Sequence, residues 1–137
     1  MFDTADMDRE GVPTEQLMTP DIITVTSDTA IDEAVETLID NDISSLVVVD
    51  DDGALAGVIT SNDILNVVTA NASDTEKTVD RFMTGQVVTI DPADDIQTAA
   101  ARMITNGISH LPVEDDEEGI VGMLSTTDIT AYSVSRA

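Results

Sequence analysis

Near its middle the chain reads Gly57-Val58-Ile59-Thr60-Ser61-Asn62-Asp63, and near its end it reads Gly122-Met123-Leu124-Ser125-Thr126-Thr127-Asp128. Both stretches have the form Gly-apolar-apolar-Thr/Ser-x-x-Asp. The agreement extends outward, because residues 18–64 align without gaps on residues 83–129 and 16 of the 47 pairs are identical. Self-similarity at a fixed spacing, here 65 residues, indicates an internal duplication. The chain therefore contains two copies of one unit.

The hydrophobic pattern predicts the order β-α-β-β-α in each copy. In the first copy, residues 22–25 predict a strand, and Thr29-x-x-Asp32 resembles a capping box at the start of a helix. An apolar stripe on that helix recurs in the second copy. Its members are Ile31, Ala34, Val35, Leu38 and Ile39, then Ile96, Ala99, Ala100, Met103 and Ile104. Two hairpins, over residues 46–59 and 111–124, each lead into a second helix, over 61–69 and about 126–133.

With 137 residues the chain has the size of one ordinary domain. Two units of roughly 60 residues should therefore share a core, and we expect neither half to be stable alone. The expected organisation is a flexible acidic leader over residues 1–11, a first repeat over 12–69, a linker over 70–78 and a second repeat over 79–137.

The charge of the chain is strongly negative, at −23, from 28 acidic and five basic residues. Such a surface repels nucleic acid and anionic membranes, so we expect neither as a partner. Two interpretations of the charge remain, a merely acidic protein or adaptation to a salt-rich cytoplasm. Because lysine is depleted to Lys77 alone, the pattern favours a halophilic source.

Several classes of protein lack support in the sequence. The chain has no cysteine, one histidine and no close Ser/His/acid trio, so we expect neither an enzyme nor a metal site. The acidic turns at 50–53 and 115–119 lack the ligand spacing of an EF-hand and are interpreted as solvated hairpin turns. The N-terminus has no apolar signal segment, which predicts a cytoplasmic protein.

The repeated phrase places a hydroxyl and a carboxylate at a strand-to-helix junction. The first amides of a helix can bind a phosphate, with Thr60 or Ser125 donating a further hydrogen bond. Asp63 or Asp128 lies one turn later, and an ionised carboxylate can accept two hydrogen bonds from the vicinal hydroxyls of a ribose. The alternative is purely structural, since the same residues are good helix caps.

A flat base would then fit between aliphatic residues of the first strands. The candidates are Ile22, Ile23, Val87 and Val88. Together with the hydroxyls and carboxylates they predict a nucleoside or nucleotide ligand.

The order of strand, amphipathic helix, apolar hairpin and repeated phrase, present twice, closely resembles the cystathionine β-synthase (CBS) domain. The resemblance is to a tandem pair, or Bateman module, over about residues 12–132. The copies begin with Leu17-Met18-Thr19-Pro20 and Phe82-Met83-Thr84-Gly85 and end in the Gly-x-x-Thr/Ser-x-x-Asp phrase. The resemblance implies a mixed α+β fold in which two repeats pack sheet to sheet with pseudo-two-fold symmetry. It also implies two composite clefts for adenosyl ligands such as AMP, ADP, ATP or S-adenosylmethionine, with no obligatory cofactor.

By this resemblance, Asp63 and Asp128 hold ribose and Thr60 and Ser125 hold phosphate. Thr24 and Thr89 line the base pocket. His110, just before Leu111-Pro112-Val113, lies where related domains often carry a phosphate-facing basic residue, and Ser45 is its counterpart; a surface or packing role for His110 is the alternative. Pro112 completes the candidate site. Because few basic residues lie near the clefts, we expect a monophosphate or sulfonium ligand in preference to ATP.

Two functions remain open. The first is a regulatory sensor that signals to a separate effector protein, and the second is a self-association or interaction scaffold whose clefts are empty. The resemblance also implies a homodimer, for which Val67, Val68 and Val134 are the candidate contacts.

Overall fold

The computed structural model describes residues 11–69 and 77–136 and divides the chain into two compact units. One unit, which we call unit 1, joins residues up to Asp21 with residues from Val88 onward; the other, unit 2, spans Ile22–Val87. The expected leader, apart from Gly11, and most of the expected linker lie outside the described residues.

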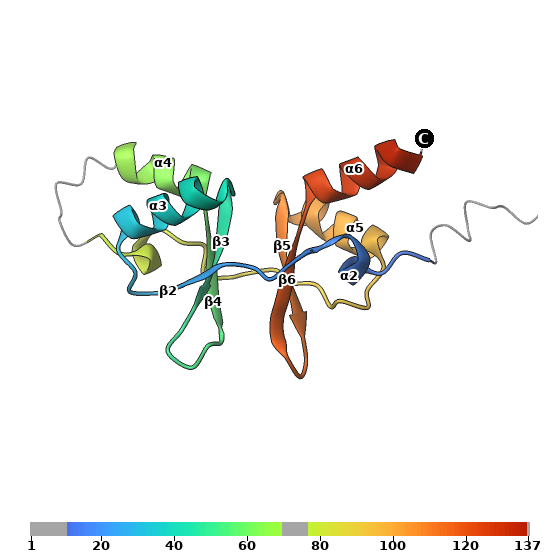
Figure 1. Cartoon of the computed structure of the whole chain (residues 1–137), viewed down its shortest axis with the longest axis horizontal. Helices are drawn as coiled ribbons and strands as arrows, with labels where there is room; N and C mark the ends of the chain where they lie inside the picture. The colour runs from blue at the N-terminus through green and yellow to red at the C-terminus, as the bar shows by residue number, and fades with distance from the viewer. Residues whose placement is uncertain (1–10, 70–76, 137) are drawn as a thin grey trace, which may run out of the picture. The chain divides into compact units, whose positions relative to one another are not determined.

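Unit 2 contains most of the first repeat (Figure 1). Its elements are β2 (Thr24–Thr26), α3 (Ile31–Asn41), β3 (Ser45–Val49), β4 (Leu55–Thr60), α4 (Ser61–Thr69) and the 3₁₀ turn η1 (Val79–Arg81). The sheet has the order β2-β3-β4, in which β2 is parallel to β3 and β3 is antiparallel to β4. This is the predicted strand, helix, hairpin and helix.

Unit 1 is built mainly from the second repeat. Its elements are α2 (Thr14–Leu17), β1 (Thr19–Pro20), α5 (Ile96–Asn106), β5 (His110–Asp115), β6 (Gly119–Ser125) and α6 (Thr126–Arg136). The sheet has the order β1-β6-β5. The predicted first strand of this repeat is reduced to one parallel bridge, between Ile90 and Val113. The prediction of a full strand at this place was therefore wrong, whereas both hairpins and the mixed α+β class are confirmed.

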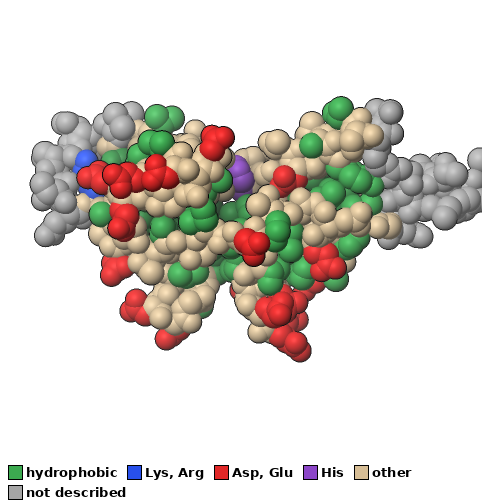
Figure 2. Space-filling model, in the orientation of Figure 1, with side chains coloured by type: hydrophobic (Ala, Val, Ile, Leu, Met, Phe, Trp, Pro, Cys, Tyr) green, Lys and Arg blue, Asp and Glu red, His purple; other side chains and the backbone are tan. Residues whose placement is uncertain are grey.

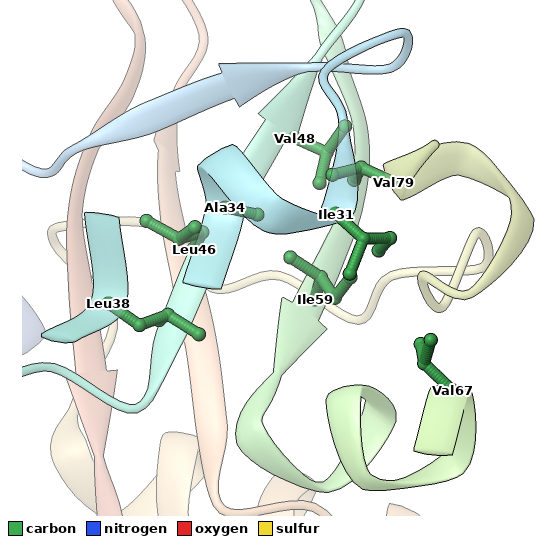
Figure 3. Packing of buried hydrophobic residues seen from close by; sticks show 8 residues of the cluster. All are labelled: Ile31, Ala34, Leu38, Leu46, Val48, Ile59, Val67 and Val79. Carbon is green, nitrogen blue, oxygen red and sulfur yellow. The ribbon is translucent and has the colours of Figure 1, made fainter. Parts of the chain in front are cut away.

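The core of unit 2 gathers aliphatic side chains from both helices and the sheet (Figure 3). Its buried members are Ile31, Ala34, Leu38, Leu46, Val48, Ile59, Val67 and Val79. Unit 1 has an equivalent core of Ile90, Ala99, Met103, Leu111, Val113 and Leu124. The helix stripes of the two repeats therefore pack in the same phase, as their sequences indicate.

The outer edge of each predicted stripe is exposed. Ile39 is 71% exposed and Ile104 is 82% exposed. At 3.6 residues per turn, the eighth residue after Ile31 lies about 80° from it around the helix axis, which carries it past the buried face. The prediction that both isoleucines are buried was wrong.

Helix α3 also begins differently from the prediction. Its N-cap is Ala30, which has no side-chain capping bond. Thr29 Oγ1 instead accepts a hydrogen bond of 3.1 Å from the backbone N–H of Thr26, and so closes the preceding turn. The capping box at Thr29 and Asp32 is therefore not formed, because the hydroxyl is committed to its own turn.

Each unit is completed by the leading segment of the other repeat, residues 12–21 in unit 1 and 77–87 in unit 2. In unit 1, β1 pairs with β6 in the register Thr19 to Met123. In unit 2, the matching residues Thr84 and Val58 form an antiparallel bridge through hydrogen bonds of 2.9 and 3.0 Å. The duplication is thus accompanied by a reciprocal exchange of leading segments.

The leading segments are firmly held. Thr14 is fully buried in unit 1, and its N–H and Oγ1 donate to the Asp94 carbonyl at 2.7 and 2.8 Å. In unit 2, Val79 belongs to the core, and its N–H donates to the Thr29 carbonyl at 2.9 Å. Both segments therefore contribute buried residues and backbone bonds to the unit that they enter.

Acidic side chains project from the ends of the hairpins (Figure 2). Asp50 Oδ1 accepts from the N–H groups of Asp52 and Ala54, each at 2.9 Å. Asp115 Oδ2 accepts from those of Glu117 and Glu118, at 3.0 and 2.9 Å. These carboxylates stabilise their own turns, as expected for acidic hairpin loops.

Candidate functional site

In unit 2, the Thr60 and Asp63 side chains meet where β4 runs into α4. Asp63 Oδ2 accepts from the Thr60 N–H at 2.8 Å and from Thr60 Oγ1 at 3.1 Å. In return, Thr60 Oγ1 lies 3.3 Å from the Asp63 N–H. This is a reciprocal capping arrangement in which Thr60 starts the helix and Asp63 secures it.

Unit 1 repeats the arrangement where β6 runs into α6. Asp128 Oδ2 accepts from the Ser125 N–H at 2.9 Å, and Ser125 Oγ accepts from the Asp128 N–H at 3.1 Å. Both carboxylates and both hydroxyl residues are half-buried. The capping role that the sequence left open is therefore present in both repeats.

In each capping arrangement, only the Oδ2 oxygen of the carboxylate accepts a hydrogen bond. In the part of the chain that the structure describes, Oδ1 of neither Asp63 nor Asp128 has a hydrogen-bond partner. A carboxylate oxygen has two acceptor positions, so each side chain can still accept bonds from a pair of hydroxyls. The cap also fixes the carboxylate in one orientation.

The helix starts offer fewer open amides than the sequence suggested. The Ser61 N–H donates to the Ser44 carbonyl at 2.9 Å, and the Thr126 N–H donates to the Ser109 carbonyl at 3.0 Å. With Thr60, Asp63 and their counterparts committed to caps, most of these N–H groups are already bonded. A phosphate would therefore depend on side chains more than on the helix start.

The candidate residues of the neighbouring strands lie directly opposite the caps. Ser45 pairs with Thr60 across β3 and β4, and His110 pairs with Ser125 across β5 and β6. His110 Nδ1 lies 3.1 Å from Ser109 Oγ. Burial lowers the pKa of the His110 imidazole from its ordinary value, and the negative charge of Asp128 opposes that shift. An imidazole, a hydroxyl and a carboxylate thus gather in unit 1, with a hydroxyl in place of the imidazole in unit 2.

The candidate base-pocket residues divide between the units. Ile22, Ile23, Thr24 and Val87 belong to unit 2, and Val88, Thr89 and Pro112 belong to unit 1. Ile23 and Val88 pack against the cores of their units. The remainder are half-buried or exposed, except Pro112, which is fully buried.

One charged residue near the candidate site was missed from the sequence. Arg102, which the helical pattern places simply on α5, donates from Nη1 to the Thr89 carbonyl at 2.7 Å and is half-buried. No spacing rule links positions 89 and 102, because the contact arises only when α5 packs beside the segment that precedes β5. A guanidinium therefore touches a predicted pocket residue of unit 1.

Comparison with known proteins identifies the family. A model of the CBS domain matches the chain twice, over residues 15–70 and 79–135. The chain belongs to the CBS-domain family. This confirms the resemblance that the duplicated motifs indicate.

Curated proteins similar to this CBS pair are much longer than it is. A homoserine O-acetyltransferase of Methanosalsum zhilinae is 35% identical over 119 residues, which cover 87% of this chain and 23% of that protein. An L-aspartate semialdehyde sulfurtransferase of Methanocaldococcus jannaschii is 36% identical over 108 residues, covering 79% and 20%. The chain thus spans about a quarter or less of these relatives.

Solved CBS pairs share the fold. The CBS domain pair of protein MJ0100, in complex with 5′-methylthioadenosine and S-adenosyl-L-methionine, aligns with a TM-score of 0.82 and 32% identity, covering 89% of this chain and 99% of that one. CBSX2 in complex with AMP aligns with a TM-score of 0.78 and 26% identity, covering 92% and 98%. Each of these two structural neighbours therefore holds adenosyl ligands.

Two further findings concern the described residues of this CBS pair. Within residues 11–69 and 77–136, no three His, Cys, Asp or Glu side chains are grouped so that they could hold a metal ion. In the same ranges, no helix has the length and apolar character needed to cross a membrane.

Proposed function

We propose that this CBS pair is a regulatory module that binds an adenosyl ligand and signals its presence to a separate effector protein. The observation that carries the proposal is the pair of capped carboxylates, Asp63 and Asp128, repeated in a chain that is 32% identical to a CBS pair holding adenosyl ligands. The proposed role of the CBS pair is regulatory.

The proposed contacts follow from the geometry of each unit. The free Oδ1 of Asp63 or Asp128, supported by the capped Oδ2, accepts hydrogen bonds from the ribose hydroxyls. Thr60 and Ser125 contact the phosphate or its replacement, and Thr24 and Thr89 with their aliphatic neighbours contact the base. A ligand acts as a signal only if it binds two conformations of the module with different affinity.

A ligand-induced stability shift tests this proposal. In concentrated potassium chloride, an adenosyl ligand at 100 times its dissociation constant should stabilise the protein by about 2.7 kcal/mol if it binds only the folded form. Concentrated salt is chosen because a net charge of −23 repels itself strongly in dilute buffer. Differential scanning fluorimetry with AMP, 5′-methylthioadenosine and S-adenosylmethionine provides the measurement.

The variants Asp63→Asn and Asp128→Asn identify the occupied site. Asparagine keeps an oxygen that can accept the capping bond but loses the charge that strengthens bonds to ribose. The shift is measured against each variant's own ligand-free midpoint, and Asp32→Asn, an exposed acid in the first turn of α3, is the matched control. If no adenosyl ligand shifts the midpoint of the unmodified protein, the scaffold function replaces the sensor.

We also propose that a second copy of the chain docks on the helices. A groove of about 370 Å³ lies between α3 and α4. It is lined by Val35, Leu38, Ile39, Asp42, Ile43, Ser61 and Ile64. The lining is mostly apolar and contains a single acid, as suits a protein contact. A two-fold contact would cover the same groove on both copies.

The residues expected to form the dimer contact differ from those suggested by the sequence. Val67 is buried in the core and is excluded as a contact, and the side chain of Val68 lies outside the described residues. Val134, at 69% exposed, and Leu65, at 61%, remain available. Val67 was misassigned because the helical pattern does not show which of two adjacent valines faces the sheet.

The variant Ile39→Glu should convert the dimer to a monomer, because it places a charge in an apolar contact. Analytical ultracentrifugation in concentrated salt is the measurement, and Gln97→Glu adds the same charge at an exposed position of α5 as control. A monomeric unmodified protein, or a dimer unaffected by Ile39→Glu, contradicts this docking site.

A further inference from the structure

The two repeats have the same capping pairs but differ in the charges around them. At the 65-residue offset, His110 of unit 1 corresponds to Ser45 of unit 2, and Arg102 of unit 1 corresponds to Thr37 of unit 2. Both differences place a basic side chain in unit 1 where unit 2 has a hydroxyl. The two candidate sites are therefore alike in shape-determining residues and unlike in charge.

His110 belongs to the same cluster as the capped carboxylate. It pairs with Ser125 across the hairpin, Ser125 is bonded to Asp128, and the Asp128 charge acts on the imidazole. A neutral imidazole that accepts from Ser109 at Nδ1 carries its proton on Nε2, and a protonated imidazole carries both. In either form His110 carries an N–H donor at Nε2.

Arg102 adds a permanent positive charge to unit 1. Its Nη1 donates a hydrogen bond to the carbonyl of Thr89. The next residue, Ile90, forms a bridge with Val113 on β5, and β5 begins at His110. The guanidinium has five N–H donors, so the bond to Thr89 leaves donors for a further acceptor. The charge persists at all ordinary pH values.

Unit 2 has hydroxyl residues at the corresponding positions. Thr37 Oγ1 donates to the Glu33 carbonyl at 2.9 Å, within its own helix. Ser45, opposite Thr60, is an uncharged hydroxyl. The carboxylate of Asp63 is therefore uncompensated at both positions where unit 1 carries a base, which disfavours an anion and favours a neutral or positively charged group.

We propose that the two sites select adenosyl ligands by charge: the Ser125–Asp128 site takes a phosphate-bearing ligand, and the Thr60–Asp63 site takes a neutral or cationic one. This inference rests on the proposed adenosyl-binding function. It assigns His110 and Arg102 as the residues that give the Ser125–Asp128 site its preference for phosphate.

Calorimetry with AMP and adenosine, which differ only in the phosphate, tests the assignment. The full-length variant Asp63→Asn isolates the Ser125–Asp128 site, and Asp128→Asn isolates the Thr60–Asp63 site. We expect Asp63→Asn to bind AMP at least about tenfold more tightly than adenosine, a difference of about 1.4 kcal/mol. We expect Asp128→Asn to show no preference for AMP and to bind S-adenosylmethionine at least as tightly as adenosine.

Two further substitutions assign the preference to a residue. His110→Ser in the Asp63→Asn background should reduce the AMP preference, and Ser45→His in the Asp128→Asn background should increase it. If His110→Ser weakens the binding of AMP and of adenosine equally, the residue supports the fold instead of selecting the ligand. The assignment is then wrong.

The outcomes separate this inference from the function beneath it. If neither single-site variant nor the unmodified protein binds adenosine or AMP, the proposed function fails. If both single-site variants bind adenosine with the same preference for AMP, the function stands and charge selection fails. Loss of all binding in Asp63→Asn, with binding retained in Asp128→Asn, also overturns the proposal.

Discussion

Replacing Gly122 with alanine is expected to lower the free energy of unfolding by about 1–3 kcal/mol, the usual cost of forcing an extra methyl group into a packed site. A Cβ on Gly122 would lie 2.5 Å from Met18 Sδ and 2.8 Å from the Thr19 carbonyl oxygen. The methionine side chain can move, but the carbonyl belongs to β1, which must shift as a whole.

Gly57 is expected to behave in the same way. Its added Cβ would lie 2.6 Å from both Met83 Sδ and the Thr84 carbonyl oxygen. Because the two glycines are in different units, the effects in a Gly57→Ala/Gly122→Ala double variant should add to within about 0.5 kcal/mol. Denaturant unfolding in concentrated potassium chloride gives these free energies.

Gly85 provides the matched control. A Cβ there meets no atom within 4 Å, and the residue is exposed. Gly85→Ala should change stability by less than about 1 kcal/mol, in the stabilising direction, because it restricts the unfolded chain. If Gly122→Ala is as stable as Gly85→Ala, the leading segment does not press on the hairpin as described.

The second expectation is that neither repeat folds alone as a monomer. A chain of residues 77–137 lacks β1 and the buried Thr14 of unit 1, and a chain of residues 1–76 lacks Val79 and Thr84 of unit 2. Each isolated repeat should show no cooperative unfolding as a monomer. An equimolar mixture should recover both units and unfold cooperatively, with a midpoint that rises with concentration.

Circular dichroism and light scattering after size-exclusion chromatography measure the outcome. The matched variant is residues 1–76 with Thr14→Val, which loses the hydrogen bond from Oγ1 to the Asp94 carbonyl and should weaken the recovery. A folded monomer of residues 77–137 would contradict the exchange of leading segments.

Much of the fold could be predicted because it depends on local pattern. The hairpins follow from apolar runs separated by acidic turns, and β3 and β4 begin and end within about a residue of the expected positions. The helix α5 ends at Asn106, and its C-cap Gly107 has a φ of 63°, the left-handed conformation that commonly ends a helix. The capped pairs were also visible, since one turn of helix brings Thr60 and Asp63 together.

The exchange of leading segments could not be predicted. The sequence repeats both partners of the contact, so Met18 could have packed on Gly57 or on Gly122 with the same local chemistry. Only the path of the chain between them distinguishes the alternatives. For the same reason, the assignment of strand residues to one carboxylate or the other remained open.

The missed contact of Arg102 has a different cause. A helical pattern gives the face on which a residue lies but not where a long side chain ends. The guanidinium reaches the Thr89 carbonyl only because α5 packs beside that segment. Its counterpart Thr37 is too short to do so and bonds within its own helix, so the similarity of the two repeats did not reveal the contact.

The reciprocal pairing of Thr19 with Met123 and of Thr84 with Val58 also bears on the origin of the gene. In an ancestor with a single copy and the same exchange, the leading segment would pair with the hairpin of a second molecule. With both copies in one chain, this pairing is intramolecular and has a high effective concentration, so the exchange of leading segments does not depend on protein concentration. Once fused, the two halves were free to diverge in sequence, which a symmetric homodimer forbids.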